Sequence, residues 1–560
     1  MANSRRIVPI VLVALGTVVL AGVLYGLQAG RLAQEPPEPA PQAARATVGD
    51  VMVVDAVGLF EFPGEWDDIE AETLTLWYPG QASWQWLVGN KHAGYAGTQE
   101  GTSCISCHSG QEQRLGQSLV GESELEGNPI PDKNPSIELD VKSAYDEDYI
   151  YFHLRWEASN PGTYHNLFRY DGTDWVRYGG PKPEVLEQNE TPSYENRISF
   201  LLDDHQNVPA FPDAHFGFTE MGCFITCHNS LRAMPAHPSS EEVQAAQYWS
   251  ERGVSDIRKY LLTTRSTFDD SGAGWDQVRP QSEIDQLKAD GQFLDLWHWR
   301  AARSNPVGYA GDDWVLEYRN FDAGQNAWFR QQVGPEWMYD PDEFGAPAVR
   351  IEDMEKNVRD LHLIQGKTAV PAQSDLPFAT DDIIPQVVLR EPEESASDIL
   401  ANGRYYEGVW TVELRRKLDT GNDDDKQMVE GQLYDLAFAI HDDAVSNRRH
   451  HISWSYSLGL NVPADIQSYR LIDGEVQPLP LKPSPLRTPG PIPLPSPDPT
   501  PDLDPTPDPD PAPDPDPTPD PDPMPDPDPM PDPDPAPDPD PTSDPDPVPD
   551  EAGLPNTSDL

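Results

Sequence analysis

Short runs of alternating hydrophobic and polar residues recur through the middle of the chain. Such alternation indicates strands that bury one face, and turn-forming residues separate the runs. Together they predict a mainly β fold, a β-sandwich built from many short strands. The predicted strands cover residues 136–142, 149–156, 197–202, 313–318, 408–414 and 434–440.

Helical patterning is limited, and its best candidate is the segment from Ser240 to Tyr260. Ser239 and Ser240 stand where a helix N-cap is expected. Acidic residues follow in the first turn, where they favour a helix start.

The first 30 residues carry a different pattern, a continuous apolar stretch from Ile7 to Leu27 preceded by Arg5 and Arg6. About 20 apolar residues span a bilayer. We expect an uncleaved anchor rather than a cleaved signal, since no clear cleavage site follows; the cleaved form stays open. The arginines place the N-terminus in the cytoplasm and the rest of the chain on the periplasmic side of the inner membrane.

At the other end, the chain becomes a Pro/Asp-rich repeat in which no core can form. We expect an extended, disordered tail that serves as a spacer or tether. The predicted organisation is a membrane anchor or signal in 1–31, a linker in 32–48, a short segment in 49–130, a β-sandwich in 131–475 and the tail in 476–560.

All four cysteines of the 560 residues lie in two motifs that end in a Cys-His pair, 104–108 and 223–228. Two thiols followed by a histidine are typical of covalently attached c-type haem, with the imidazole as proximal iron ligand. The second motif has three residues between its cysteines instead of two, so its attachment loop must bulge. The predicted cofactor-binding residues are Cys104, Cys107, Cys223 and Cys227, and the predicted proximal ligands are His108 and His228.

Other interpretations of these cysteines are weaker. A zinc ion held by either motif would lack an obvious fourth ligand. Two local disulfides, or a redox Cys-x-x-Cys, would leave the adjacent histidines unexplained. Two covalently bound c-type haems account for every cysteine in the chain.

Several longer runs are distinctive: DEDYIYFHLRW (146–156), YENRISFLLDD (194–204), GCFITCH (222–228), LDLWHWRAARSNPVG (294–308), GVWTVELRRKLDT (408–420) and HHISWSYSLGL (450–460). These runs resemble the haem-binding domain family of ethylbenzene dehydrogenase. That family includes the electron-transfer gamma subunits of dimethyl-sulfide-dehydrogenase-like molybdenum enzymes and their multihaem cytochrome relatives. The resemblance covers roughly residues 130–465, which assigns the second haem to the β-sandwich in 131–475. The segment 49–130 that precedes it resembles a short cytochrome c segment and would hold the first haem.

The resemblance implies a haem held in a β-sandwich for electron transfer, without substrate chemistry of its own. The gamma subunits hold haem through a methionine and a late lysine, and here the late position is His450. We therefore expect His450 as the sixth ligand of the second haem, with His451 and Met234 as alternatives. For the first haem we expect His92, which follows an aromatic run sixteen residues before His108.

The formal net charge of −56 argues against nucleic acid as a partner and permits docking to a basic redox protein. The predicted function is a membrane-anchored periplasmic dihaem cytochrome of a respiratory chain, an electron carrier rather than an enzyme. Its expected partners are a redox protein or quinol, with a molybdenum-containing or other periplasmic reductase as one candidate. The alternatives are a dihaem oxidoreductase such as a peroxidase, with one open haem site, or a sandwich that binds a non-haem ligand.

Overall fold

The structure, a computed structural model, describes residues 54–55, 58–228, 238–267, 274–324, 329–331, 334–353, 362–373 and 375–479. All of these belong to one compact unit, residues 1–492. The apolar stretch 7–27, Met234 and the tail from residue 480 lie outside the described residues. Within the described part, no helix combines the length and apolar character that a bilayer crossing requires.

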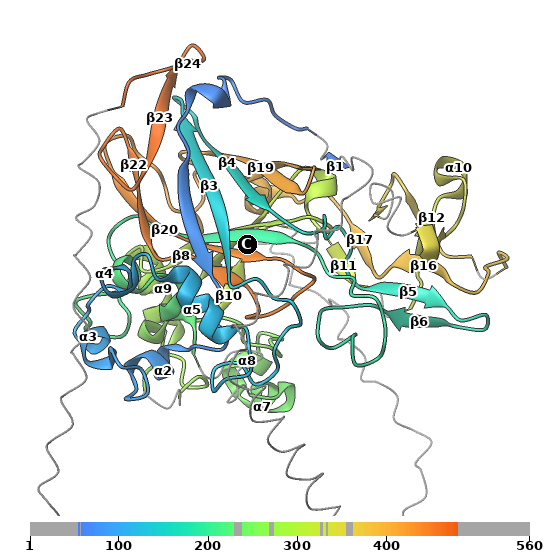
Figure 1. The fold of residues 1–560 in the computed structure, drawn as a ribbon, viewed down its shortest axis with the longest axis horizontal. Helices are drawn as coiled ribbons and strands as arrows, with labels where there is room; N and C mark the ends of the chain where they lie inside the picture. Colours follow the sequence, from blue (N-terminus) through green and yellow to red (C-terminus); the bar gives the residue numbers. More distant parts are fainter. Residues whose placement is uncertain are drawn as a thin grey trace, which may run out of the picture. The chain divides into compact units, whose positions relative to one another are not determined.

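A 15-stranded sheet forms the framework (Figure 1). Most neighbouring strands in it are antiparallel, while β23 runs parallel to β22 and to β3. In spatial order its main path is β1 (Val54–Asp55), β18 (Leu400–Tyr406), β19 (Val409–Lys417), β4 (Tyr149–Glu157), β3 (Ser136–Tyr145), β2 (Glu72–Trp77), β21 (His451–Ile452), β20 (Leu433–His441), β7 (Arg197–Asp203), β8 (Leu294–Arg300), β9 (Gly311–Val315) and β10 (Arg319–Phe321), with β22 (Tyr456–Leu460), β23 (Ile466–Ile472) and β24 (Glu475–Val476) attached beside it.

The sheet turns back on itself, so that its two halves bury a common hydrophobic core. Phe152 of β4 lies 5.3 Å from Phe200 of β7 and 5.6 Å from Trp297 of β8, measured between ring centroids. Trp156, Trp299 and Trp410 extend the same core and are almost fully buried. The apolar positions of the predicted alternating strands therefore face one continuous hydrophobic core.

Smaller sheets lie to one side of the framework, at the right of Figure 1, around a hydrophobic cluster of their own. They comprise β5 (Leu167–Tyr170), β6 (Trp175–Tyr178), β13 (Val349–Arg350) and β16 (Asp382–Pro385); β11 (Phe329–Gln331), β14 (Leu363–Ile364) and β17 (Val387–Leu389); and β12 (Trp337–Tyr339) with β15 (Ala369–Pro371).

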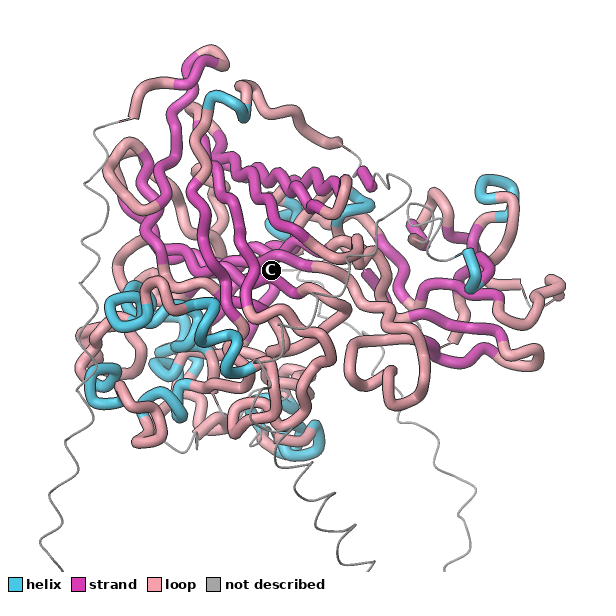
Figure 2. The backbone as a smooth tube through the Cα atoms, viewed as in Figure 1, coloured by secondary structure: helices cyan, strands magenta, loops and turns pink. Residues whose placement is uncertain are grey.

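Most helices gather at one end of the large sheet, at the lower left of Figure 1 and in cyan in Figure 2. They pack on the sheet through a second hydrophobic cluster, which also contains Cys223 and Cys227. The helices are α2 (Trp84–Val88), α3 (Tyr95–Gln99), α4 (Cys104–His108), α5 (Glu112–Leu119), α6 (Phe218–Met221), α7 (Ser240–Ala245), α8 (Gln247–Ser250), α9 (Gln281–Ala289) and, beside the small sheets, α10 (Pro341–Phe344). Short 3₁₀ turns are η1 (Trp66–Asp68), η2 (Gly222–Thr226), η3 (Leu262–Thr264), η4 (Asn305–Val307), η5 (Ile351–Asp353) and η7 (Glu394–Ser397).

The prediction of a mainly β fold is confirmed, and two of its details are wrong. The helix predicted from Ser240 does start with a capping box between Ser239 and Glu242, but it breaks at Ala246, whose backbone is extended. The chain after α8 has no helix before η3, because Ile257 and Tyr260 are pulled into the second cluster. The strand predicted for 313–318 ends at Val315, where the chain turns into β10.

Candidate functional site

The first Cys-His motif forms the single helical turn α4. Cys104 and His108 are half-buried and Cys107 is exposed. Residues three and four apart share one face of a helix, so Cys104, Cys107 and His108 project to the same side. This arrangement suits attachment of a flat cofactor at the surface of the second cluster.

His92 faces His108 across a short gap. The two ring centroids lie 6.2 Å apart, with an angle of 36° between the ring planes. Two imidazoles on opposite sides of one metal ion, with metal–nitrogen bonds of about 2.0 Å, would place their ring centres about 6 Å apart. The pair predicted from sequence therefore lies at the separation that one shared iron requires.

The tautomer of His92 is set by the backbone. Its Nδ1 lies 2.9 Å from the carbonyl oxygen of Leu87, to which the N–H donates. A neutral imidazole that donates from Nδ1 has its lone pair on Nε2. Ligating histidines are usually oriented by such a bond. Trp86, 5.3 Å from the ring, packs against it as well.

Burial lowers the pKa of His108, and the neighbouring His92 lowers it further. Both effects disfavour the imidazolium form. A neutral ring is the form that binds a metal, so the environment prepares His108 as a ligand.

The second motif lies in a different environment. Cys223 is inside the 3₁₀ turn η2, and Cys227 follows it with an extended backbone. Gly222 opens the turn at φ +55°, a conformation that favours glycine. Cys223, Cys227 and His228 are only 8%, 3% and 0% exposed. The longer gap between the cysteines is thus accommodated by a tight turn inside the core.

Both ring nitrogens of His228 contact protein groups. Nε2 lies 3.0 Å from the carbonyl oxygen of Tyr260, and Nδ1 lies 3.3 Å from Nε2 of Gln85. The ring also stacks on Tyr260, at a centroid distance of 4.2 Å. The residue types at this motif fit a c-type haem, but iron ligation would require one ring nitrogen of His228 to leave its present partner.

The predicted sixth ligand of the second site, His450, lies just before β21 and is half-buried. Its Nδ1 donates to the carbonyl oxygen of Asn447 at 2.9 Å, which leaves the lone pair on Nε2, as in His92. Its ring packs on His441 at 4.6 Å rather than on His228.

His450 and His228 both lie in surroundings that disfavour the imidazolium form. Burial lowers the pKa of His228 to about 3 and that of His450 well below its ordinary value, and the charge of Arg448 acts in this direction on both. His451, by contrast, is fully buried, and its Nε2 contacts the carbonyl oxygen of Asn134. The lone pair therefore lies on Nε2 in His450 and on Nδ1 in His451.

The two motifs lie next to one another. Cys104 Sγ is 3.9 Å from the sulfur of Met221, two residues before Cys223. The backbone N–H of Trp84 donates to the carbonyl oxygen of Cys227 at 2.5 Å. Helix α2 therefore serves both sites, because Gln85 contacts His228 while the Leu87 carbonyl orients His92.

A series of aromatic rings also links the two Cys-His motifs. Trp454 lies 5.9 Å from His108 and 5.0 Å from Trp77, and Trp77 lies 6.3 Å from Phe224 inside the second motif. Trp454 is 3% exposed, and its Nε1 donates to a carboxylate oxygen of Glu112 at 2.7 Å.

Sequence analysis missed the roles of Gln85 and Trp454. The aromatic run that contains Gln85 was a visible signal, and Trp454 stands only four residues after His450. Neither signal, however, indicates which motif the side chain contacts.

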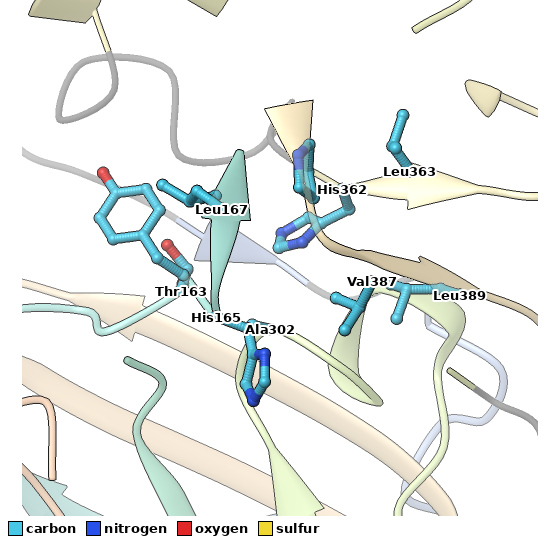
Figure 3. A pocket seen from close by; sticks show the side chains of 10 residues that line it. Thr163, His165, Leu167, Ala302, His362, Leu363, Val387 and Leu389 are labelled. Atoms are coloured by element: carbon cyan, nitrogen blue, oxygen red, sulfur yellow. The ribbon is translucent and has the colours of Figure 1, made fainter. Parts of the chain in front are cut away.

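One small cavity lies away from both motifs, among the short strands (Figure 3). Its volume of about 10 Å³ is near the minimum for a single water molecule. Both ring nitrogens of His165 are buried without a hydrogen-bond partner among the described residues, which is consistent with such a water. The lining includes Thr163, His165, Leu167, Ala302, His362, Leu363, Val387 and Leu389. The cavity is far too small for a haem.

Comparison with known proteins identifies the family of the chain. The family model described as ethylbenzene dehydrogenase matches residues 66–453, and the chain belongs to this family. The predicted family is thereby confirmed, and the match begins early enough to include the first Cys-His motif. The chain is also similar to cytochrome c-552 of Stutzerimonas stutzeri, with 22% identity over 407 residues that cover 72% of this chain and 90% of the relative.

Proposed function

We propose that this protein is a dihaem c-type cytochrome that transfers electrons in a respiratory chain, anchored in the inner membrane with its folded part in the periplasm. Two Cys-His motifs that use every cysteine support it, as does similarity to a protein named cytochrome c-552. When bound, haem supplies reversible one-electron chemistry, with a potential that depends on axial ligands, burial and nearby charge.

The side chains have distinct roles in this proposal. At the first site, Cys104 and Cys107 would form the thioethers, and His108 and His92 would ligate the iron. At the second site, Cys223 and Cys227 would form the thioethers, with His228 as the proximal ligand and His450 as the sixth. In each predicted sixth ligand a backbone carbonyl holds the Nδ1 proton, so that Nε2 is available.

The observation that carries the proposal is the adjacency of the two motifs around one helix. Cys104 contacts the chain two residues before Cys223, and α2 contacts a histidine of each site. Two cofactors attached here would be close neighbours, as direct electron exchange between them requires. The acidic folded part favours a basic redox partner; a quinol or a molybdenum-containing or other periplasmic reductase also fits the proposal.

One observation favours a second candidate, a dihaem oxidoreductase such as a peroxidase with one open iron. His92 and His108 face each other, whereas His228 stacks on Tyr260 and His450 packs at a tilt against His441. If His450 does not ligate the second iron, that iron has an open position for a substrate. High-spin ferric haem together with peroxide turnover would support this candidate.

The test is haem quantitation on the full chain after denaturing electrophoresis. The wild type should retain two covalent haems. The variant with Cys104→Ala and Cys107→Ala should retain one, and the variant with Cys223→Ala and Cys227→Ala should also retain one. Absence of covalent haem from the wild type would overturn the proposal. A wild type with one covalent haem, lost in the Cys104→Ala and Cys107→Ala variant but kept in the Cys223→Ala and Cys227→Ala variant, would limit the proposal to the first site.

A further inference from the structure

A group of buried carboxylates lies far from the cysteine motifs in the sequence, at the end of the sheet formed by β9 and β10. Asp312 is in β9, and Asp322 comes directly after β10. Asp424 and Asp425 lie in the loop 418–432 that joins β19 to β20, and Asp295 is in β8. All five are less than 9% exposed.

Arg416 neutralises one part of this group. Its Nη1 donates to Asp295 Oδ2 at 2.6 Å and to Asp425 Oδ1 at 2.9 Å, and it lies 3.9 Å from Asp312 Oδ1. The guanidinium also lies over the ring of Trp297, 4.5 Å from its centroid. A cation is therefore already in place among Asp295, Asp312 and Asp425.

The other part contains Asp322, Asp424 and Asp425, and of these Arg416 contacts only Asp425; within the described residues no cationic side chain pairs with Asp322 or Asp424. Asp322, Asp424 and Asp425 each offer one oxygen, and these three oxygens lie within 4.8 Å of one another. The nearby Lys426 is directed elsewhere, with its Nζ 3.2 Å from Asp203 and 3.0 Å from Asp204.

The side chain of Asp322 is a second, independent observation that points to a bound ion. It is 3% exposed, and neither of its carboxylate oxygens has a hydrogen-bond partner in the part of the chain that the structure describes. The same is true of Asp312, at 1% exposure. Buried polar groups are nearly always satisfied, and a buried carboxylate without a partner is costly.

The remaining two carboxylates are held in fixed orientations. Asp424 accepts hydrogen bonds from Ser395 Oγ and from the backbone N–H of Ala323, both at 2.9 Å. Asp425 accepts from Thr420 Oγ1 at 2.6 Å through the oxygen that does not bind Arg416. Such orienting contacts are what ligating carboxylates usually have.

The charge balance points the same way. Among the described residues, the five buried carboxylates have one guanidinium, that of Arg416, between them. A divalent cation would balance the excess negative charge.

We propose that Asp322, Asp424 and Asp425, with Asp312 beside them, bind one calcium ion that fastens the loop 418–432 to the β9–β10 end of the sheet. All of the donors are oxygens, which calcium prefers and zinc does not. Oxygens at a calcium bond length of about 2.4 Å are separated by at most about 4.8 Å, which agrees with the observed spread. Magnesium usually keeps several waters and is less suited to a site with this much burial.

The test measures calcium content and thermal stability of the full-length holoprotein. After dialysis against calcium-free buffer, elemental analysis should find one tightly held calcium per chain in the wild type. Chelator treatment should then lower Tm, and calcium chloride should restore it, because a ligand that binds only the folded state stabilises it. The same concentration of magnesium chloride should not restore it.

Asp322→Asn and Asp424→Asn should lose both the tightly held calcium and the calcium-dependent Tm shift, while keeping two haems. Asp423→Asn is the matched control, because Asp423 lies in the same loop and its side chain is 93% exposed. The Asp-rich tail is present in every variant, so any weak calcium binding by the tail contributes equally to all of the measurements. A wild type without tight calcium and with a Tm indifferent to chelator, or an Asp322→Asn variant that retains the ion, would overturn the proposal.

Discussion

The first Cys-His motif lies on a half-exposed helical turn, and a second histidine already faces its own. The second motif lies in a buried turn, and its histidine is engaged by a carbonyl, an amide and a tyrosine ring. The same residue types therefore occur in one preformed site and in one site that must rearrange. The surroundings of each motif in the fold, more than the spacing of its residues in the sequence, determine how ready it is to ligate iron.

The largest effect is expected from Trp454→Ala, which removes the buried ring that contacts both His108 and Trp77. Loss of a buried tryptophan side chain costs about 3–5 kcal/mol of unfolding free energy. Because the ring belongs to the cluster shared by the two motifs, both sites should be disturbed. Urea unfolding and the spectra of both haems would measure this.

Trp454→Phe is the control, since it keeps a ring in the cluster and should cost much less. If Trp454→Ala disturbed only the first site, the view of one shared core beneath both motifs would be wrong.

The next largest effect should come from His92→Ala, which removes the ring that faces His108. We expect one of two haems to change from low-spin to high-spin while the other is unaffected, because His92 serves only the first site. Electron paramagnetic resonance of the ferric protein would distinguish the high-spin haem from the low-spin haem.

His450→Ala should affect the second haem instead of the first. His215→Ala, at an exposed position, should affect neither haem.

Gln85→Leu should have a moderate effect confined to the second site. It removes the amide that contacts His228 Nδ1, and loss of one such hydrogen bond costs about 1 kcal/mol. Gln99→Leu is a matched control in the same segment, where the amide donates to the carbonyl oxygen of Val88 instead. A change in the second haem spectrum with Gln99→Leu, or none with Gln85→Leu, would contradict the bridging role of α2.

The smallest effect is expected from Gly94→Ala. A Cβ at this glycine would stand 3.1 Å from Cε1 of His92, so the ring must shift by a few tenths of an ångström. We expect a cost below about 1 kcal/mol, since the position is exposed, and a measurable shift of the first haem's midpoint potential. Gly121→Ala, where an added Cβ has no neighbour within 4 Å, should leave the potential unchanged.

Much of this fold could be predicted from alternation, because strands such as β3, β4, β19 and β20 each place one face in the interior. The break of the predicted helix at Ala246 could not, because burial of Ile257 and Tyr260 against the sheet overrides local helix preference. The short helices α2 to α5 were also missed. Helices of only five to eight residues show little periodicity, and they depend on packing for their stability.

For the candidate site, the cysteines and proximal histidines could be read from spacing alone, and His92 could be named from its neighbourhood. The haem ligation itself stays a prediction. The contact between the two motifs could not be predicted from the sequence, because Cys104 and Met221 are brought together only when the sheet has formed. The residue that faces His228 was equally hidden, since Gln85 carries no motif.

The pairing of β2 has a consequence for how this chain is made. Trp77 of β2 pairs with Ile452 of β21, so a strand synthesised early lacks one neighbour until almost all of the folded part has emerged. Pairings between distant parts of a chain form late and slowly. The first cysteine motif, whose His108 contacts Trp454, therefore lacks part of its final surroundings for most of synthesis.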